Sequence, residues 1–160
     1  MTSTAPTTPA TRSTAHSTFV VERTFDASVE RVWRAFADPT EKHAWFGTSD
    51  DWTTSEDTDD FRVGGTAVSE GEFHGGPVSR YVATYTDVVE PERFVLTYDM
   101  WLDGAHISTS VATYELTADG DGTHLRYTEQ GVHLDGPDSA EGREEGTRGI
   151  FDVLAVHLGE

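Results

Sequence analysis

Between Gly64 and Gly122 the chain is divided at short intervals by turn-forming residues, and the segments between them alternate apolar and polar side chains with a period of two. The turn signals are Gly64-Gly65, Gly75-Gly76-Pro77, Glu90-Pro91-Glu92, Asp103-Gly104 and Asp119-Gly120-Asp121-Gly122. Alternation of this kind is typical of strands that bury one face. Short connections favour pairing of consecutive strands, so the sequence predicts about five or six strands in an antiparallel meander.

One of these strands can be oriented from its pattern, whereas a second is ambiguous. In the strand predicted at 94–102, one face carries four apolar or aromatic side chains: Phe94, Leu96, Tyr98 and Met100. Between 107 and 117 the alternation is inconsistent, because Tyr114 and Leu116 indicate one inward set whereas Ile107 and Val111 indicate the opposite set. A bulge in that strand would bring both sets inward, and we predict one.

The segment before the meander predicts one strand and two short helices. Residues 1–17 contain no apolar run and are expected to form a disordered tail. A first strand should begin at about Thr18, with Arg23 on the same side as its apolar residues. Ser28 is a candidate N-cap for a helix to about 36. Asp38 can cap a second helix ending near 45–47, and Glu41 can complete a capping box there.

A long C-terminal helix is predicted at about 139–158, where Ile150, Leu154 and Leu158 recur at helical spacing. Its N-terminal half carries Gly142 and Gly146 on one side, with Gly149 one turn further. Each interior glycine costs about 1 kcal/mol of helix propensity relative to alanine. Two explanations stay open: either this helix packs very closely on the sheet, or the missing side chains leave a space between them.

Composition excludes several classes of function. With 160 residues and no cysteine, the chain fits one domain, 18–160, without disulfides or thiol chemistry. A formal net charge of −18 opposes binding to nucleic acid and to anionic membranes. The seven histidines show no metal-binding spacing, so we expect neither a metal nor a cofactor. No signal peptide or membrane span is recognisable, and a cytoplasmic location is expected.

Several short motifs, in this order and spacing, resemble the activator-of-Hsp90-ATPase-homologue (AHSA1-like) family of the START-like superfamily, also called SRPBCC or Bet v 1-like. The resemblance covers about residues 18–158. It rests on Arg23-Thr24-Phe25-Asp26-Ala27, Val32-Trp33, Asp38-Pro39, Trp45-Phe46, Phe61-Arg62-Val63-Gly64-Gly65, Thr128-Glu129-Gln130-Gly131 and Leu134-Asp135-Gly136. It implies an α+β helix-grip fold, in which a bent antiparallel sheet wraps around the long C-terminal helix and encloses a cavity.

One departure from the family concerns the cavity. Many members carry Gly-Trp at the position where this chain has Gly146-Thr147. The absence of that indole should leave a roomier cavity or a different filler. Ligands known for other members therefore do not transfer directly to this chain.

Glu129 is the main candidate site residue, because it alternates with Leu125 and Tyr127 and should point into the interior. A buried carboxylate needs a cationic partner, and Arg23 is the candidate. A strand-end residue at a wet rim is the alternative for Glu129, and a structural ion pair is the alternative for Arg23. The other predicted cavity residues are Tyr127, Tyr98, Met100, Trp45, Phe46, Gly146, Thr147 and Ile150.

Three functions remain open on sequence alone. The leading one is binding of a small apolar or aromatic molecule, such as a lipid or a polyketide-like metabolite, by a protein that does not bind nucleic acid or insert into membranes. The second is a metal-free cyclase, aromatase or hydrolase that uses Glu129 as acid and base. The third is an Hsp90-type co-chaperone or interaction module. A homodimer is compatible with each.

Overall fold

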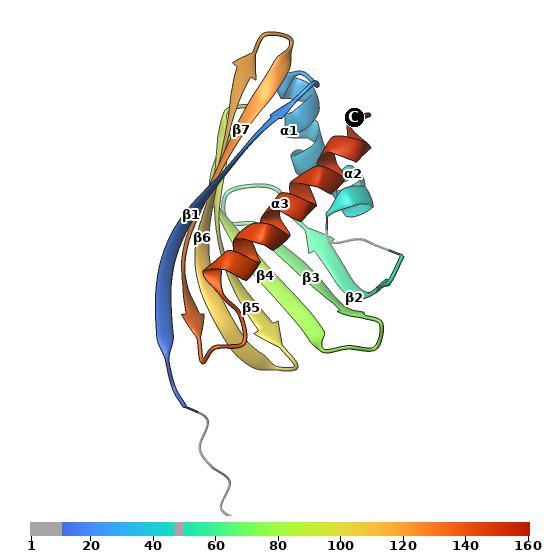
Figure 1. Cartoon of the computed structure of the whole chain (residues 1–160). Helices are drawn as coiled ribbons and strands as arrows, with labels where there is room; N and C mark the ends of the chain where they lie inside the picture. The colour runs from blue at the N-terminus through green and yellow to red at the C-terminus, as the bar shows by residue number, and fades with distance from the viewer. Residues whose placement is uncertain (1–10, 47–49) are drawn as a thin grey trace, which may run out of the picture.

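The computed structural model describes residues 11–46 and 50–160, which form a seven-stranded antiparallel sheet and three helices (Figure 1). The elements in chain order are β1 (Thr14–Phe25), α1 (Val29–Ala37), α2 (Pro39–Trp45), β2 (Trp52–Asp59), β3 (Thr66–Phe73), β4 (Val78–Val89), β5 (Arg93–Leu102), β6 (Ala105–Asp119), β7 (Gly122–Leu134) and α3 (Ala140–His157). Within the described ranges, no helix is long and apolar enough to cross a membrane.

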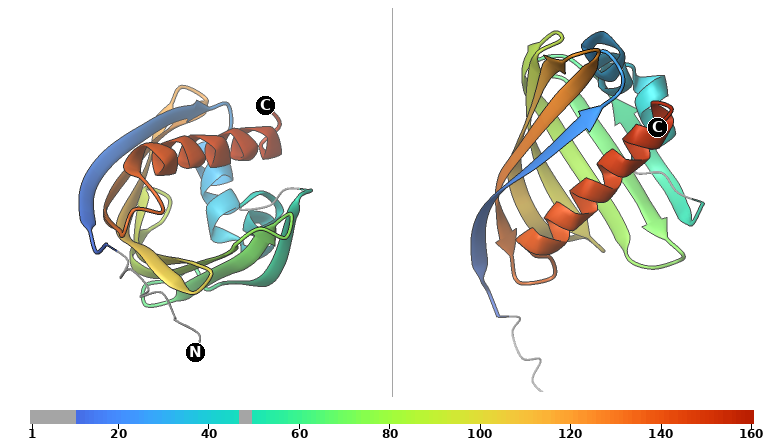
Figure 2. Two further views of the ribbon diagram at one scale, coloured as in Figure 1. Left: turned by 60° about the horizontal axis from the view of Figure 1, so that its bottom comes forward. Right: turned by 45° about the horizontal axis from the view of Figure 1, so that its top comes forward.

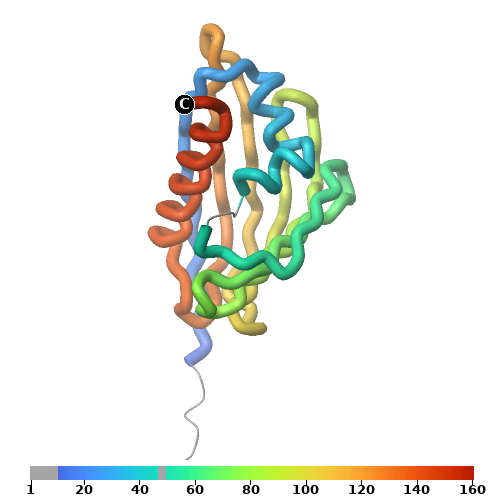
Figure 3. The backbone as a smooth tube through the Cα atoms, turned by 90° about the vertical axis from the view of Figure 1, so that its right-hand side faces the viewer, coloured from blue at the N-terminus to red at the C-terminus, as the bar shows by residue number. Residues whose placement is uncertain are grey.

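The sheet has the order β1-β7-β6-β5-β4-β3-β2. Strands β2 to β7 therefore form an antiparallel meander of six strands, within the predicted five or six, and β1 pairs with β7 at its far end. Figure 2 shows the sheet bent around α3, and Figure 3 shows α3 running beside β1 while α1 and α2 lie further along the same face. This arrangement is the helix-grip fold, so the fold that the resemblance implied is confirmed.

The first strand begins four residues earlier than predicted, at Thr14 instead of Thr18. Thr14 pairs with Leu134 on β7. Just before it, the carboxylate of Asp135 accepts hydrogen bonds from Arg12 Nη1 at 2.8 Å and from the Ser13 backbone N–H at 3.0 Å. The start of the strand is held by backbone pairing of exposed residues, so no apolar alternation marks it. The remainder of the predicted tail, residues 1–10, lies outside the described residues.

The strand bulge predicted for 107–117 is confirmed at Ile107, but it does not bring Val111 inward, since Val111 remains 37% exposed. Met100 of β5 pairs with Ser108, whereas the next residue, Trp101, pairs with His106. Ile107 is therefore the extra residue on β6. Ile107 and Ser108 are both buried, with 6% and 0% of their surface exposed, so the bulge turns two consecutive side chains inward.

The core lies where α1 covers the sheet. Phe94 of β5 stacks on Tyr114 of β6 with ring centroids 4.2 Å apart, and Trp33 and Phe36 of α1 pack edge-on or tilted against Phe94. Aromatic pairs of this kind stabilise a core beyond the area they bury. Helix α1 thus fills this end of the bent sheet, and of these four side chains only Tyr114 reaches the space beneath α3.

The predicted caps are confirmed, with one correction. Ser28 Oγ accepts a hydrogen bond from Arg31 N at 3.2 Å, and Asp38 Oδ1 accepts one from Glu41 N at 3.1 Å. The side chain of Glu41 does not complete a capping box, because its carboxylate bonds to Arg31 of α1 and lies 3.0 Å from Nε2 of His157 of α3. Glu41 thus connects all three helices. Of the predicted helix end at 45–47, Gly47 lies outside the described residues.

A Glu41→Gln variant is expected to be less stable than the wild type at pH 7, and the difference should shrink as the pH falls. Burial acts to raise the pKa of Glu41, but hydrogen bonds from His157 and Arg31 lower it below 4.5 overall. A lowered pKa in the folded state stabilises the protein above the unfolded value of 4.5, and this contribution disappears as the pH falls through the folded value. Because Glu41 is only partly buried, we expect its ionised carboxylate to contribute about 1 kcal/mol or less to the free energy of unfolding.

Urea unfolding followed by circular dichroism at pH 7 and at pH 3.5 would test this expectation. Glu30→Gln is the matched control, because Glu30 lies in the first turn of α1 and is exposed. A difference between Glu41→Gln and the wild type that stays constant over this pH range would contradict the proposed role of the carboxylate.

Candidate functional site

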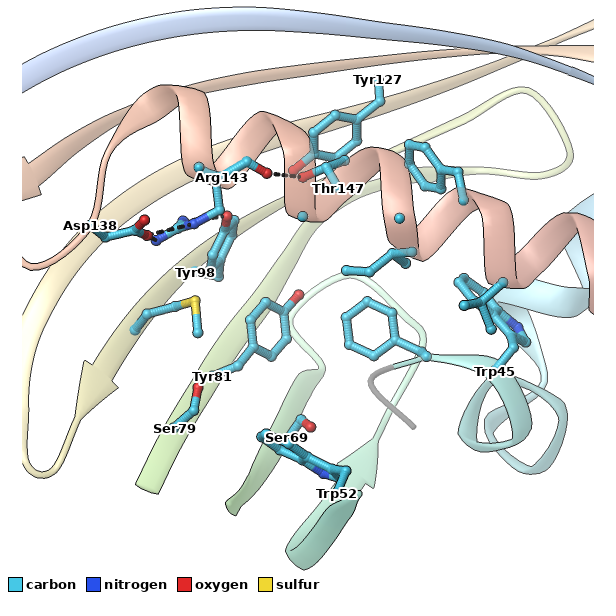
Figure 4. Close-up of a pocket in the computed structure, with 18 of the residues that line it drawn as sticks. Trp45, Trp52, Ser69, Ser79, Tyr81, Tyr98, Tyr127, Asp138, Arg143 and Thr147 are labelled. Atoms are coloured by element: carbon cyan, nitrogen blue, oxygen red, sulfur yellow. Dashed lines mark hydrogen bonds and ion pairs between the residues drawn. The ribbon is translucent and has the colours of Figure 1, made fainter. Parts of the chain in front are cut away.

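A pocket of about 530 Å³ lies between α3 and strands β2 to β7, with α2 at one end (Figure 4). Its walls combine aromatic and aliphatic side chains with a few polar ones. They are Trp45, Phe46, Trp52, Ser69, Ser79, Tyr81, Tyr98, Met100, Tyr114, Tyr127, Asp138, Gly142, Arg143, Gly146, Thr147, Gly149, Ile150, Phe151 and Val153. A volume in this range suits a small or medium organic molecule.

The glycines of α3 border this pocket, and they answer the question that the sequence left open. A Cβ built on Gly146 or Gly149 would meet no atom within 4 Å, whereas one on Gly142 would lie 3.2 Å from Ser139 Oγ. Close packing of α3 on the sheet is therefore excluded at Gly146 and Gly149. Both glycines are exposed, so the missing side chains leave the pocket open toward solvent on this side of the helix.

Arg143 forms the polar end of the pocket. Its guanidinium donates to Asp138 Oδ2 through Nε at 3.0 Å and Nη2 at 2.6 Å, to Tyr98 Oη through Nη1 at 2.7 Å, and to Ser108 Oγ through Nη2 at 2.9 Å. Figure 4 shows Arg143 reaching from α3 toward Asp138 and Tyr98. Only 10% of the side chain is exposed, so the helix and the sheet are joined here through a buried cation.

Glu129 is buried directly behind this end, with 2% of its surface exposed. Its Oε1 accepts hydrogen bonds from the hydroxyls of Tyr98 and Tyr127, the latter at 2.5 Å, and its Oε2 lies 3.6 Å from Arg143 Nη1. The alternative of a wet rim position is therefore wrong. Glu129 does not itself border the pocket, from which the two tyrosines separate it.

The charges of this cluster keep its phenols protonated. Burial, followed by the charge of Glu129, raises the pKa of Tyr98 far above its usual value of 10. The pKa of Tyr127 is also raised, by burial and then by neighbouring Tyr114, Tyr98 and Glu129. Burial acts to lower the pKa of Arg143, but Tyr98, Glu129 and Asp138 raise it overall, so Arg143 stays cationic. Tyr98 and Tyr127 therefore act as donors to a carboxylate.

The opposite end of the pocket is apolar. Trp45 is 1% exposed and its indole N–H donates to the Ala35 carbonyl at 3.0 Å, which fixes the ring. The indole of Trp52 lies against Gly71, where a Cβ would come within 2.6 Å of its ring. The absence of a side chain at Gly71 thus lets Trp52 lie flat along β3 and form a wall.

A second buried charge pair supports this apolar end from outside. Lys42 Nζ of α2 lies 2.8 Å from Asp59 Oδ2 of β2 and 3.1 Å from the Tyr85 hydroxyl, which in turn donates to Asp59 at 2.8 Å. Lys42 also lies over the Phe46 ring, 4.8 Å from its centroid. The pair therefore fixes α2, and with it Trp45 and Phe46, against the edge of the sheet.

Eight of the ten residues predicted for the cavity border the pocket: Tyr127, Tyr98, Met100, Trp45, Phe46, Gly146, Thr147 and Ile150. Glu129 lies one layer behind them. Arg23 is not the partner of Glu129: it pairs with Asp152 on α3, which is the structural ion pair given as its alternative. Glu129 pairs across the sheet with Phe19, four residues before Arg23 on β1. Four residues of strand span about 13 Å, too far for an ion pair.

Arg143 is the residue that the sequence analysis missed. A signal was present, since Arg143, Thr147, Ile150 and Leu154 follow the spacing of one helical face, and the last three were recognised as apolar or cavity residues. Its partners on β5, β6 and β7 could not be identified from that spacing. Trp52, Tyr81 and Tyr114 were also missed as wall residues.

The polar groups of the pocket do not form a metal site. Among residues 11–46 and 50–160, no group of three or more histidine, aspartate or glutamate side chains is placed to hold a metal ion. Arg143 also occupies the position between the two nearest carboxylates, Glu129 and Asp138. The chemistry available in the site is hydrogen bonding by phenols and hydroxyls next to aromatic surface.

Comparison with known proteins places the chain in a family. A family model described as "Activator of Hsp90 ATPase homolog 1-like protein" matches residues 26–159. The crystal structure of the Mll3558 protein from Rhizobium loti is 47% identical, covers 91% of this chain and 99% of its own, and superposes with a TM-score of 0.84. An uncharacterized protein from Rhizobium leguminosarum is 36% identical over 92% of this chain and 97% of its own, with a TM-score of 0.88.

A more distant structure shares the fold alone. The AHSA1-like protein from Aeromonas hydrophila is 21% identical, covers 89% of this chain and 92% of its own, and gives a TM-score of 0.66. No curated protein matches the chain.

Proposed function

The chain belongs to the activator of Hsp90 ATPase homolog 1-like family, and from this membership together with the pocket we propose that it binds a small apolar or aromatic molecule, such as a lipid or a polyketide-like metabolite. The open space beside Gly146 and Gly149 carries the proposal. Interior glycines weaken a helix by about 1 kcal/mol each, and here no close packing compensates for that loss. A ligand in the pocket would supply the missing contacts.

The walls of the pocket match such a ligand. Trp45, Trp52 and Phe46 supply aromatic surface at one end, and Tyr98 and Thr147 place hydroxyl groups at the other. Pockets that bind drug-sized molecules are lined in this way, by apolar side chains with a few oriented polar groups. We propose a cytosolic protein in which the ligand lies along α3 with its polar end toward Tyr98.

A pair of substitutions at Gly146 tests whether the ligand occupies this space. Gly146→Ala and Gly146→Leu should each raise the free energy of unfolding by about 0.5–1 kcal/mol, because both side chains favour the helix and the first atom meets no neighbour. Only leucine is long enough to extend into the pocket. We therefore expect Gly146→Leu to lose ligand and Gly146→Ala to retain it.

The measurement is native mass spectrometry of the wild type and both variants against a panel of lipids and aromatic polyketides. The alanine variant is the matched control, because it shares the helix effect and lacks the bulk. Ligands that bind the leucine variant as tightly as the wild type would place binding outside the pocket. A panel without any bound ligand would contradict the proposed function itself.

Catalysis by Glu129 is the second candidate, and the observation that bears on it is the position of Tyr98 and Tyr127. Tyr98 and Tyr127 both border the pocket and donate to Glu129, so a proton would pass between substrate and carboxylate through one of these two phenols. Candidate substrates recovered unchanged after long incubation would favour binding alone.

A clear rise in the turnover of a cognate Hsp90-type ATPase on addition of the protein would favour the co-chaperone alternative instead.

A further inference from the structure

We infer, on the premise of the proposed function, that the pocket selects electrically neutral ring compounds bearing hydroxyl or carbonyl groups and discriminates against carboxylates and phosphates. The inference concerns the charge of the ligand, which neither the family nor the shape of the pocket determines. Three observations carry it: the bonding of Arg143, the net charge around it, and the free phenols of the pocket.

Arg143 has little capacity left for an anion. A guanidinium carries five N–H groups. Four hydrogen bonds from Arg143 already reach protein oxygens, and Nη1 lies 3.6 Å from Glu129 Oε2. A bidentate grip on a ligand carboxylate would need two free parallel N–H groups. An anionic ligand would have to displace Asp138 or Ser108, both of which belong to the protein.

The charges next to the pocket sum to a negative value. Glu129 and Asp138 contribute two negative charges, and Arg143 contributes one positive charge. His133 Nδ1 also lies 4.0 Å from Asp138 Oδ2, and histidine adds no charge above the pH range in which it ordinarily titrates. At the other end, Lys42 and Asp59 cancel. One uncompensated negative charge therefore lies at the polar end, in a protein whose formal net charge is −18. An anion entering this end would meet repulsion from the cluster and from the protein as a whole.

Neutral polar groups of a ligand can form hydrogen bonds with two phenols of the pocket. Tyr81 and Tyr114 border the pocket, and among the described residues neither hydroxyl has a hydrogen-bond partner. Figure 4 shows the Tyr81 hydroxyl directed across the pocket toward α3. Burial raises the pKa of both phenols, so both remain protonated and can donate to a carbonyl or accept from a hydroxyl. They lie between the apolar end and Arg143, where the polar groups of a ring compound would be placed.

The test compares 2-naphthamide with 2-naphthoate, which have nearly the same shape and differ in charge. The ¹⁵N-labelled protein would be titrated with each compound, and the backbone amide signals of Gly146 and Gly149 would report binding at the pocket wall. The titrations are run at pH 8, above the range in which histidine ordinarily titrates. We expect the amide to bind at least about tenfold more tightly than the carboxylate, because one unit charge within several ångströms has an effect of that size.

An Asp138→Asn variant should reverse much of this preference. Asp138 Oδ1 accepts a hydrogen bond from the Ser139 N–H at 2.8 Å, and the oxygen of asparagine can keep this bond. The substitution removes the excess negative charge and weakens the interaction with the Arg143 guanidinium. We expect the ratio of the two affinities to fall at least about fivefold. Glu141→Gln is the control, because it makes the same charge change three residues further along, in the first turn of α3, on an exposed side chain.

The outcomes separate the two proposals. If naphthoate binds the wild type as tightly as naphthamide, the charge selectivity is wrong while the proposed function stands. The selectivity is also wrong if Asp138→Asn leaves the ratio unchanged, or if Glu141→Gln shifts it as much. If neither compound perturbs the Gly146 and Gly149 amides of the wild type or of Asp138→Asn, the binding function itself is contradicted.

Discussion

Replacing Arg143 with methionine is expected to lower the free energy of unfolding by about 3–5 kcal/mol, the range found when one partner of a buried ion pair is removed. Methionine fills a similar volume, so the loss would come from charge and hydrogen bonding. Glu129 would remain buried at 2% exposure without a cation, and Asp138, Tyr98 and Ser108 would lose a donor. Urea unfolding at pH 8 followed by circular dichroism would measure the change.

Two further variants make this expectation specific. Arg148 lies on the same helix, but its side chain is 53% exposed and its Nη2 is 3.7 Å from Glu144 Oε2. We therefore expect Arg148→Met to lower the free energy of unfolding by no more than about 0.5 kcal/mol. Adding Glu129→Gln to Arg143→Met should recover part of the stability, because the unpaired buried charge is then removed. A loss below about 1 kcal/mol for Arg143→Met would show that water or a neighbouring group replaces the guanidinium.

Lys42→Met is the second substitution with a large expected effect, again about 3–5 kcal/mol. The side chains of Lys42 and Asp59 are only 8% and 9% exposed, so removal of the ammonium leaves a buried carboxylate whose remaining donor is the Tyr85 hydroxyl. The pair joins α2 to β2, and its loss would also loosen the wall formed by Trp45.

The matched control for this pair is Arg62→Met, since Arg62 is 75% exposed and its partner Asp60 is 52% exposed. We expect that variant to change the free energy of unfolding by less than about 0.5 kcal/mol. Asp59→Asn in the Lys42→Met background should restore part of the loss, and unfolding curves of the three variants would show it. Equal stability of Lys42→Met and Arg62→Met would mean that the buried pair contributes nothing.

The sequence predicted those parts of the site that follow from local periodicity. Alternation along β7 correctly predicted that Glu129 points inward. The prediction holds because β7 pairs with β1 on one side and β6 on the other and so has no freedom to rotate. The glycine spacing correctly identified the side of α3 that faces the pocket. Each inference needed only the period of one element.

The parts that were missed depend on distances between elements. Alternation placed Arg23 on the inner face of β1, but a period of two does not say how far along the strand a partner lies. Arg143 binds groups on β5 and β6 that are 45 and 35 residues away in sequence. Trp52 belongs to β2, whose other residues are mostly exposed and polar, so no apolar pattern indicated that one of its side chains would reach the pocket.

Two of the four tryptophans border the pocket and two do not, and this division gives the protein an internal optical signal. Trp45 and Trp52 border the pocket, whereas Trp33 packs against Phe61 and Phe94 in the core, and Trp101 stacks on His106. A bound chromophore that absorbs at the wavelengths of tryptophan emission would accept excitation energy from Trp45 and Trp52 at the shortest range. Occupancy of the pocket can therefore be followed from the emission of the unlabelled protein, without a reporter group that would itself compete for the space.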